Sequence, residues 1–162
     1  MAALFLSGTG GDLTCAVDRE KETGLPYVCE RFPGAFEHRY AGVQGSIYVL
    51  PAETFLEGQT GWEEEVVSPV AVAPIDEILV DDAAAYIRSL QDQGRLRIYF
   101  YPSRPPEIPE DDEDLVMRGI VWTRAFGERV LEEFIRYHPH LIDRIKRGLA
   151  EGRYRDLSPG LA

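Results

Sequence analysis

The sequence predicts a mixed α+β domain in which a strand-rich first part is followed by helices. β-Branched and aromatic residues gather in the short segments 45–55 and 96–101, which is typical of strands. After residue 115, apolar residues recur at helical spacing. No internal repeat is visible, and the order of the elements, strands first and helices last, is that of an α+β chain.

We expect the 162 residues to form one domain, 1–162, because a chain of this length fits a single core. The composition is 44% apolar and 28% charged, which is ordinary for a globular protein that buries a core. Three consecutive parts are expected: a strand-rich part over 4–101, an acidic Pro-rich loop over 102–114, and C-terminal helices over 115–155.

The first half of the chain alternates short apolar segments with turns. Residues 4–6 read as a short strand that runs into a glycine-rich turn, and residues 18–26 are polar and loop-like. A second short strand is expected at 27–29. Pro33 then stands where a helix would begin, and Gly42 is its expected stop.

The strongest strand signal in the first half of the chain is "GSIYVLPAETF" at 45–55. Residues 63–80 predict two further strand segments, and the prolines in them favour edge positions. A helix capped by Asp81 or Asp82 follows, and then the strand at 96–101. The chain is expected to close with two helices in sequence, separated near Pro139.

The net charge of −11 argues against nucleic acid as a partner, because most of the surface repels phosphate. The C-terminal segment is locally basic, and we interpret it as the basic end of a helix. Cys15 and Cys29 lie in no metal-binding or disulfide pattern, so reduced thiols and a cytoplasmic location are expected. No segment approaches the roughly 20 apolar residues that span a membrane, and no signal peptide is visible.

Two motifs are candidates for chemistry. In "SGTGG", residues 7–11, glycine lets backbone N–H groups approach a ligand, but the stretch lacks the P-loop lysine and the dinucleotide fingerprint. Taken alone it is typical of a turn. In "EEEVVS", residues 63–68, alternation along a strand would place Glu63 and Glu65 on one face, where a carboxylate could point into a cleft. The three histidines have no metal-ligand spacing, and no metal is expected.

Three segments, in this order, resemble the ADP-ribosyltransferase-like fold, in particular the small bacterial branch that includes rifampin ADP-ribosyltransferase. "LFLSGTGG" is similar to the opening strand and turn of that family, with Ser7 where the family has a histidine. "PYVCERFPGAFEHRYAGVQGSIYVLPAETF" is similar to the strand, helix and strand that follow, and "EEEVVSPVAV" to the strand that carries a glutamate. The resemblance covers residues 4–80 and implies a split, mostly antiparallel sheet.

The resemblance also implies that NAD is bound and its nicotinamide–ribose bond cleaved. In that scheme Ser7 holds the ribose, and Gly8 and Thr9 belong to the same nicotinamide-binding turn. Tyr27 or Tyr40 stacks on the ring, and Glu65 stabilises the oxocarbenium-like transition state. The acceptor, a protein, a small molecule or water, is not indicated.

Ser7 is shorter than the family's histidine and lacks its second ring nitrogen, so it can make one contact to the ribose but cannot reproduce the full arrangement. Two functions therefore stay open. The first is an ADP-ribosyltransferase or NAD glycohydrolase. The alternative is a non-catalytic protein of the same fold, whose acidic surface engages a basic protein partner. Exposure of Glu65 would favour the second.

Overall fold

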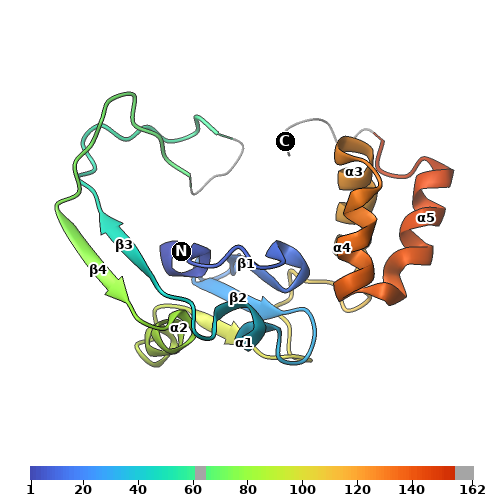
Figure 1. The fold of residues 1–162 in the computed structure, drawn as a ribbon, viewed down its shortest axis with the longest axis horizontal. Helices are drawn as coiled ribbons and strands as arrows, with labels where there is room; N and C mark the ends of the chain where they lie inside the picture. Colours follow the sequence, from blue (N-terminus) through green and yellow to red (C-terminus); the bar gives the residue numbers. More distant parts are fainter. Residues whose placement is uncertain (61–64, 156–162) are drawn as a thin grey trace.

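The computed structural model describes residues 1–60 and 65–155 and has its strands in two separate sheets (Figure 1). One is three-stranded, in the order β1-β2-β5, formed by β1 (Cys15–Arg19), β2 (Pro26–Glu30) and β5 (Arg97–Tyr99). β1 and β2 are antiparallel, and β2 and β5 are parallel. The other is an antiparallel pair, β3 (Gly45–Val49) with β4 (Asp76–Val80). The predicted α+β class with C-terminal helices is confirmed.

The first hydrophobic core forms where two helices pack on the three-stranded sheet. These helices are α1 (Ala35–Tyr40) and α2 (Ala83–Asp92). Asp82 begins α2 as expected, since its carboxylate accepts the backbone N–H groups of Ala85 and Gly42, both at 2.8 Å. These two hydrogen bonds hold the pKa of Asp82 below its usual value. Several side chains of this core are fully buried: Leu4, Val28, Phe36, Tyr40 and Ile87.

The C-terminal helices form a second core, and we call residues 113–155 the bundle. It consists of α3 (Glu113–Phe126), α4 (Arg129–Tyr137), the short 3-10 helix η3 (Pro139–Leu141) and α5 (Ile142–Glu151). The helices approach closely at two glycines, where an added Cβ atom would collide with an isoleucine of the facing helix. Gly119 of α3 meets Ile145, and Gly148 of α5 meets Ile120.

Four expectations are corrected by the structure. Residues 4–6 are not a strand but part of a 3-10 helix, η1 (Ala2–Phe5), closed by the hydrogen bond from the Leu4 N–H to the Met1 carbonyl. The predicted loop at 18–26 begins inside β1, which pairs with β2 as a hairpin. The chain closes with three α-helices rather than two, because α3 continues the helical pattern N-terminal to α4. Of the two strand segments expected over 63–80, the described part contains β4 and one isolated bridge, Leu56 to Val67.

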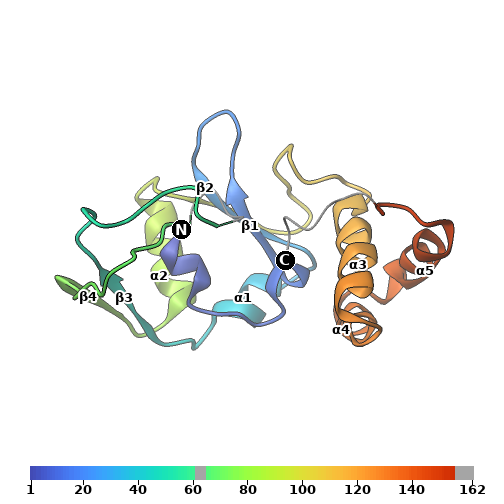
Figure 2. The same ribbon diagram turned by 90° about the horizontal axis from the view of Figure 1, so that it is seen from above.

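The β3–β4 pair projects from the rest of the molecule, and we call residues 45–80 the arm. Figure 1 shows β3 and β4 on the side opposite the bundle, with the three-stranded sheet and its helices between them, while the chain beyond these two strands curves back above the N-terminal part. Figure 2, turned by 90°, again has β4 as the outermost element of that end. None of the helices in the described residues has the length and apolar character needed to cross a membrane.

Candidate docking surface on the arm

The glycine-rich turn expected to hold ribose is held together by its own hydrogen bonds. The Ser7 hydroxyl donates to the Thr9 hydroxyl at 3.2 Å, and the Thr9 N–H donates back to the Ser7 oxygen at 3.3 Å. The Gly11 N–H donates to the Gly8 carbonyl at 3.1 Å. Ser7 is buried, whereas Gly8 and Thr9 are exposed. Several polar groups of the turn are therefore used in shaping it.

Arg39 anchors this turn through hydrogen bonds from its guanidinium. Its guanidinium is 4% exposed and donates to three main-chain carbonyls: Ser7 at 3.2 Å, Gly11 at 2.9 Å and Cys15 at 2.8 Å. The carbonyl oxygens of the turn thus face the protein interior, where a cation satisfies them. The turn is a rigid structural element tied to α1 through a buried arginine.

The other residues expected to bind NAD lie apart from one another. Tyr27 and Tyr40 are buried in different hydrophobic clusters, and the Tyr40 hydroxyl donates to the Leu4 carbonyl at 3.0 Å. Burial raises the pKa of both tyrosines well above the usual range. Glu65 is exposed and belongs to the arm. Within the described residues no hydrogen bond or ion pair joins Glu65 to the turn; Glu63 and Glu64 lie outside those residues.

His138 links the bundle to the N-terminal part of the molecule. It is 1% exposed, and its Nε2 lies 2.6 Å from the Leu13 carbonyl. A carbonyl only accepts, so Nε2 carries the proton and donates it. Burial lowers the pKa of His138, which keeps the imidazole neutral at physiological pH.

The two cysteines are free thiols in the core. Burial raises the pKa of Cys15 to about 12 and that of Cys29 to about 11. At neutral pH both are therefore protonated, and neither is suited to nucleophilic chemistry. Among the residues that the structure describes, no group of three or more His, Cys, Asp or Glu side chains could hold a metal ion.

A pocket of about 440 Å³ lies beside the β1–β2 hairpin. Its floor is a network around Glu20, which accepts from the Tyr99 hydroxyl at 2.7 Å and pairs with Arg97 at 2.8 Å. Hydrogen bonds from Thr23 and then Tyr99 hold the pKa of Glu20 below its usual value. These groups satisfy one another. Lys21, Glu22 and Glu107 also line the pocket, and Glu107 accepts the Lys21 backbone N–H at 2.8 Å through Oε1, while its Oε2 is buried without a hydrogen-bond partner. None of the residues predicted to bind NAD lines this pocket.

The arm exposes many large hydrophobic side chains, as the binding surface of a protein does before its partner covers it. Within residues 1–60 and 65–155, fifteen large hydrophobic residues are exposed, and ten of them lie on the arm. Leu79 is 73% exposed, Ile75 69% and Tyr48 56%. The other seven have smaller exposed fractions and lie along the same segment: Val49, Leu50, Leu56, Val66, Val67, Val70 and Ile78. Folded proteins seldom expose so many large apolar side chains on one segment unless that segment serves to bind something.

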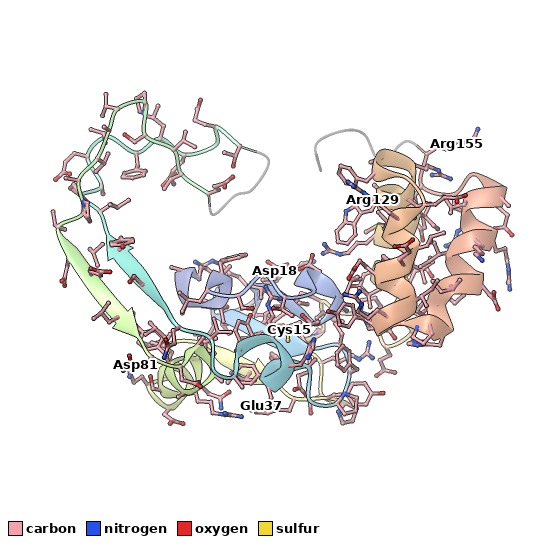
Figure 3. The ribbon with its side chains drawn as sticks, viewed as in Figure 1. Cys15, Asp18, Glu37, Asp81, Arg129 and Arg155 are labelled. Carbon is pink, nitrogen blue, oxygen red and sulfur yellow. The ribbon has the colours of Figure 1, made fainter. Side chains whose placement is uncertain are left out.

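The charges of the arm are of one sign. Residues 45–80 contain no lysine, arginine or histidine, and they contain seven carboxylates: Glu53, Glu57, Glu63, Glu64, Glu65, Asp76 and Glu77. Of these, the five that the structure describes make no ion pair with a described basic residue. In Figure 3 the side chains of the described part of the arm lie on both sides of its ribbon and apart from the packed side chains of the body.

The sequence contains a signal for this surface that is visible only over a long stretch of chain. Between Arg39 and Arg88 there is no basic residue, while β-branched and aromatic residues remain frequent. A segment that is both acidic and apolar is unusual for a buried sheet and also for a solvated loop. The three carboxylates at 63–65 do not predict this surface by themselves. The prediction requires the acidic and apolar composition of the whole arm.

The fold and this surface together define an α+β protein with a projecting acidic and apolar arm. Comparison of the chain with protein-family models, with curated proteins and with solved structures gave no match.

Proposed function

We propose that this protein is a non-catalytic interaction module that binds a basic protein partner through the arm. The observation that carries the proposal is the coincidence of ten exposed large hydrophobic residues with seven carboxylates on one basic-free segment. Apolar side chains supply the area that an interface buries, and the carboxylates around them select partners by charge.

The two kinds of side chain have different roles in binding. Burying Leu79 and Tyr48 against a partner would contribute roughly 25 cal/mol for each Å² of apolar surface removed from water. The carboxylates contribute less to affinity, because rim charges act mainly on the association rate and on the salt dependence. The proposed complex is therefore held by apolar contacts and steered by charge.

A peptide-display selection tests this function and shows which kind of sequence the arm prefers. Random linear peptides displayed on phage are selected on the wild-type protein, with a triple variant, Glu57→Gln, Asp76→Asn and Glu77→Gln, as the matched control. These three side chains are exposed, so the variant should fold normally. We expect selected peptides to be basic and rich in apolar residues, with about tenfold weaker binding to the triple variant and a loss of affinity at high salt.

Two results of this selection would contradict the proposal. One is the absence of any enriched peptide class on the wild-type protein. The other is a set of peptides that bind wild type and triple variant equally, since the arm would then take no part in recognition. A Leu79→Ser variant separates the apolar contribution, because it leaves every carboxylate in place.

Cleavage of NAD is a second candidate, favoured by the division of the strands into two sheets and by the order of the segments that resemble the ADP-ribosyltransferase-like fold. Ser7, Gly8 and Thr9 would then meet the ribose and nicotinamide, and Glu65 would act on the ribose. This function requires the arm to bring Glu65 toward the turn when NAD binds. It also requires Tyr27 or Tyr40 to leave the core if either is to stack on the ring.

Nicotinamide release from NAD tests the second candidate directly. We expect Glu65→Ala to abolish any release without changing the melting temperature, and Glu57→Ala to serve as the control on the same arm. Ser7→His would raise NAD affinity if that position meets the ribose, as measured by calorimetric titration. Absence of release and of NAD binding in the wild-type protein would remove this candidate and leave the interaction module.

A further inference from the structure

The arm carries a strand edge that nothing in the described structure covers. β4 pairs with β3 over the register Gly45 to Val80 through Val49 to Asp76, and among the described residues it has no second neighbour. Both ribbon views place β4 outermost, with its far edge directed away from the rest of the molecule (Figures 1 and 2). Along an antiparallel strand, alternate N–H and C=O groups point to each side, so β4 directs backbone groups outward that pair with no other strand among the described residues. Of its N–H groups, that of Glu77 donates to the Asp76 carboxylate at 2.8 Å.

The ribbon is also uncovered on one face. Side chains that oppose each other across an antiparallel pair lie on the same face, which groups Ser46 with Leu79 and Tyr48 with Glu77. On this face lie the two most exposed large hydrophobic residues of the two strands, Leu79 at 73% and Tyr48 at 56%. The opposite face is directed toward the body at its base, where Val80 is 3% exposed.

Two strands alone bury too little apolar area to form a stable sheet. Isolated pairs are marginal in water, and a third strand or a covering helix usually supplies the missing area. Proteins protect such edges with charged side chains, proline or a bulge. In β4 the two charges, Asp76 and Glu77, lie at its beginning, and residues 78–80, "ILV", carry neither a charge nor a proline. The edge of β4 therefore has the properties of a template for an added strand.

The negative charge of the arm determines which kind of strand could pair with β4. A second copy of this chain would bring another arm with seven carboxylates against the first, and the two would repel each other. An extended segment with basic residues at alternate positions would instead place its cations on one face of the ribbon, near Asp76. Apolar residues at the other positions would lie on the opposite face, beside Leu79 and Tyr48.

We infer that the partner binds by strand addition: an extended basic and apolar segment of another protein pairs with the free edge of β4 and completes a three-stranded sheet. The inference rests on the proposed function and specifies how the arm recognises its partner. Main-chain hydrogen bonds supply affinity in this mode, and the alternating side chains supply selectivity.

The test uses the full-length protein and a synthetic peptide of alternating lysine and valine. A peptide of alternating glutamate and valine is the charge control, and the lysine–valine peptide methylated on its backbone nitrogens is the control for main-chain pairing. Affinity is measured by fluorescence anisotropy at low and high salt. Hydrogen exchange of the amides of Asp76–Val80 is followed by NMR with and without peptide.

Strand addition predicts a specific combination of results. The lysine–valine peptide binds, the other two bind at least tenfold more weakly, and the β4 amides that exchange fast in the free protein become protected at least tenfold. Binding without protection of these amides, or equal binding of the methylated peptide, overturns strand addition and leaves the proposed function standing. If the lysine–valine peptide does not bind at low salt, both are overturned.

Discussion

The bundle and the arm are opposite solutions to the same requirement, that apolar side chains be removed from water. In the bundle, Leu115, Ile120, Phe134 and Ile145 are all fully buried between helices of the same chain. In the arm, Leu79 and Tyr48 are exposed over more than half of their surface. The bundle completes its own core, whereas the arm does not.

Their charges differ in the same way. Glu113 of the bundle receives hydrogen bonds from Tyr154, Arg153 and Arg144, the last at 2.7 Å, and these hold the pKa of Glu113 below its usual value. On the arm, Asp76 and Glu77 form no ion pair with a described basic residue. A region that satisfies neither its apolar nor its charged groups internally indicates that another molecule satisfies them.

The strongest test of this contrast is a pair of truncations. Phe134→Ala removes a fully buried ring from the bundle core and should lower the free energy of unfolding by about 3–5 kcal/mol. Leu79→Ala removes an exposed side chain and should change it by no more than about 0.5 kcal/mol. Urea denaturation of both variants measures the difference. A Leu79→Ala variant destabilised as strongly as Phe134→Ala would mean that the arm packs against the body.

The next effect concerns the arginine beneath the glycine-rich turn. Arg39→Met leaves the carbonyls of Ser7, Gly11 and Cys15 without their donor, so we expect a loss of about 3 kcal/mol. Arg88→Met is the control, because Arg88 forms an exposed pair with Glu37, which is worth at most about 1 kcal/mol. Thermal unfolding of the two variants compares them. Equal losses would contradict the structural role assigned to the turn.

His138 predicts a pH dependence of the contact between the bundle and Leu13. Its folded pKa is lowered, so below the unfolded value of about 6.5 the unfolded chain binds a proton that the folded protein does not. Stability therefore falls as the pH drops from 6.5 toward the folded pKa, by at most about 1.4 kcal/mol per pH unit. His138→Gln keeps a donor for Leu13 and should flatten this part of the profile. Denaturation midpoints between pH 7 and 5 measure it, and an unchanged slope in the variant would assign the dependence to other groups.

Elements determined by local chemistry were predictable from the sequence. The cap at Asp82, the strand beginning at Gly45 and the apolar spacing of α4 and α5 each depend on a few neighbouring residues. Residues 4–6 were predicted wrongly, since a short apolar run does not distinguish a strand from a buried helical turn. Burial of Leu4 against Tyr40, far along the chain, supports the observed form.

The candidate site was less predictable because exposure is a property of the whole fold. Tyr27 and Tyr40 look equally available for stacking in the sequence, and only tertiary packing places both in the core. Leu79 and Ile78 belong to a segment predicted as an edge strand, and the structure exposes both side chains because no further element among the described residues covers the ribbon. Sequence pattern indicates which residues prefer burial, and it does not indicate whether the chain itself buries them.

The smallest expected change in stability is also the most discriminating for function. In the triple variant, Glu57→Gln, Asp76→Asn and Glu77→Gln, three exposed charges are removed from an arm that has no basic residue, so like-charge repulsion decreases. The free energy of unfolding should change by less than about 0.5 kcal/mol, and any change should be stabilising. Urea denaturation at low salt measures this effect, which high salt should abolish.

Binding of the lysine–valine peptide by the same variant should fall by about tenfold, so that stability and affinity separate. The matched control is Glu128→Gln, Glu132→Gln and Glu133→Gln, which removes three carboxylates from the beginning and first turns of α4 and leaves the arm intact. If charge acts through the overall field of the protein, both triple variants lose affinity equally. If the arm is the docking surface, only the first does, because the attraction depends on carboxylates within about one Debye length of the bound strand.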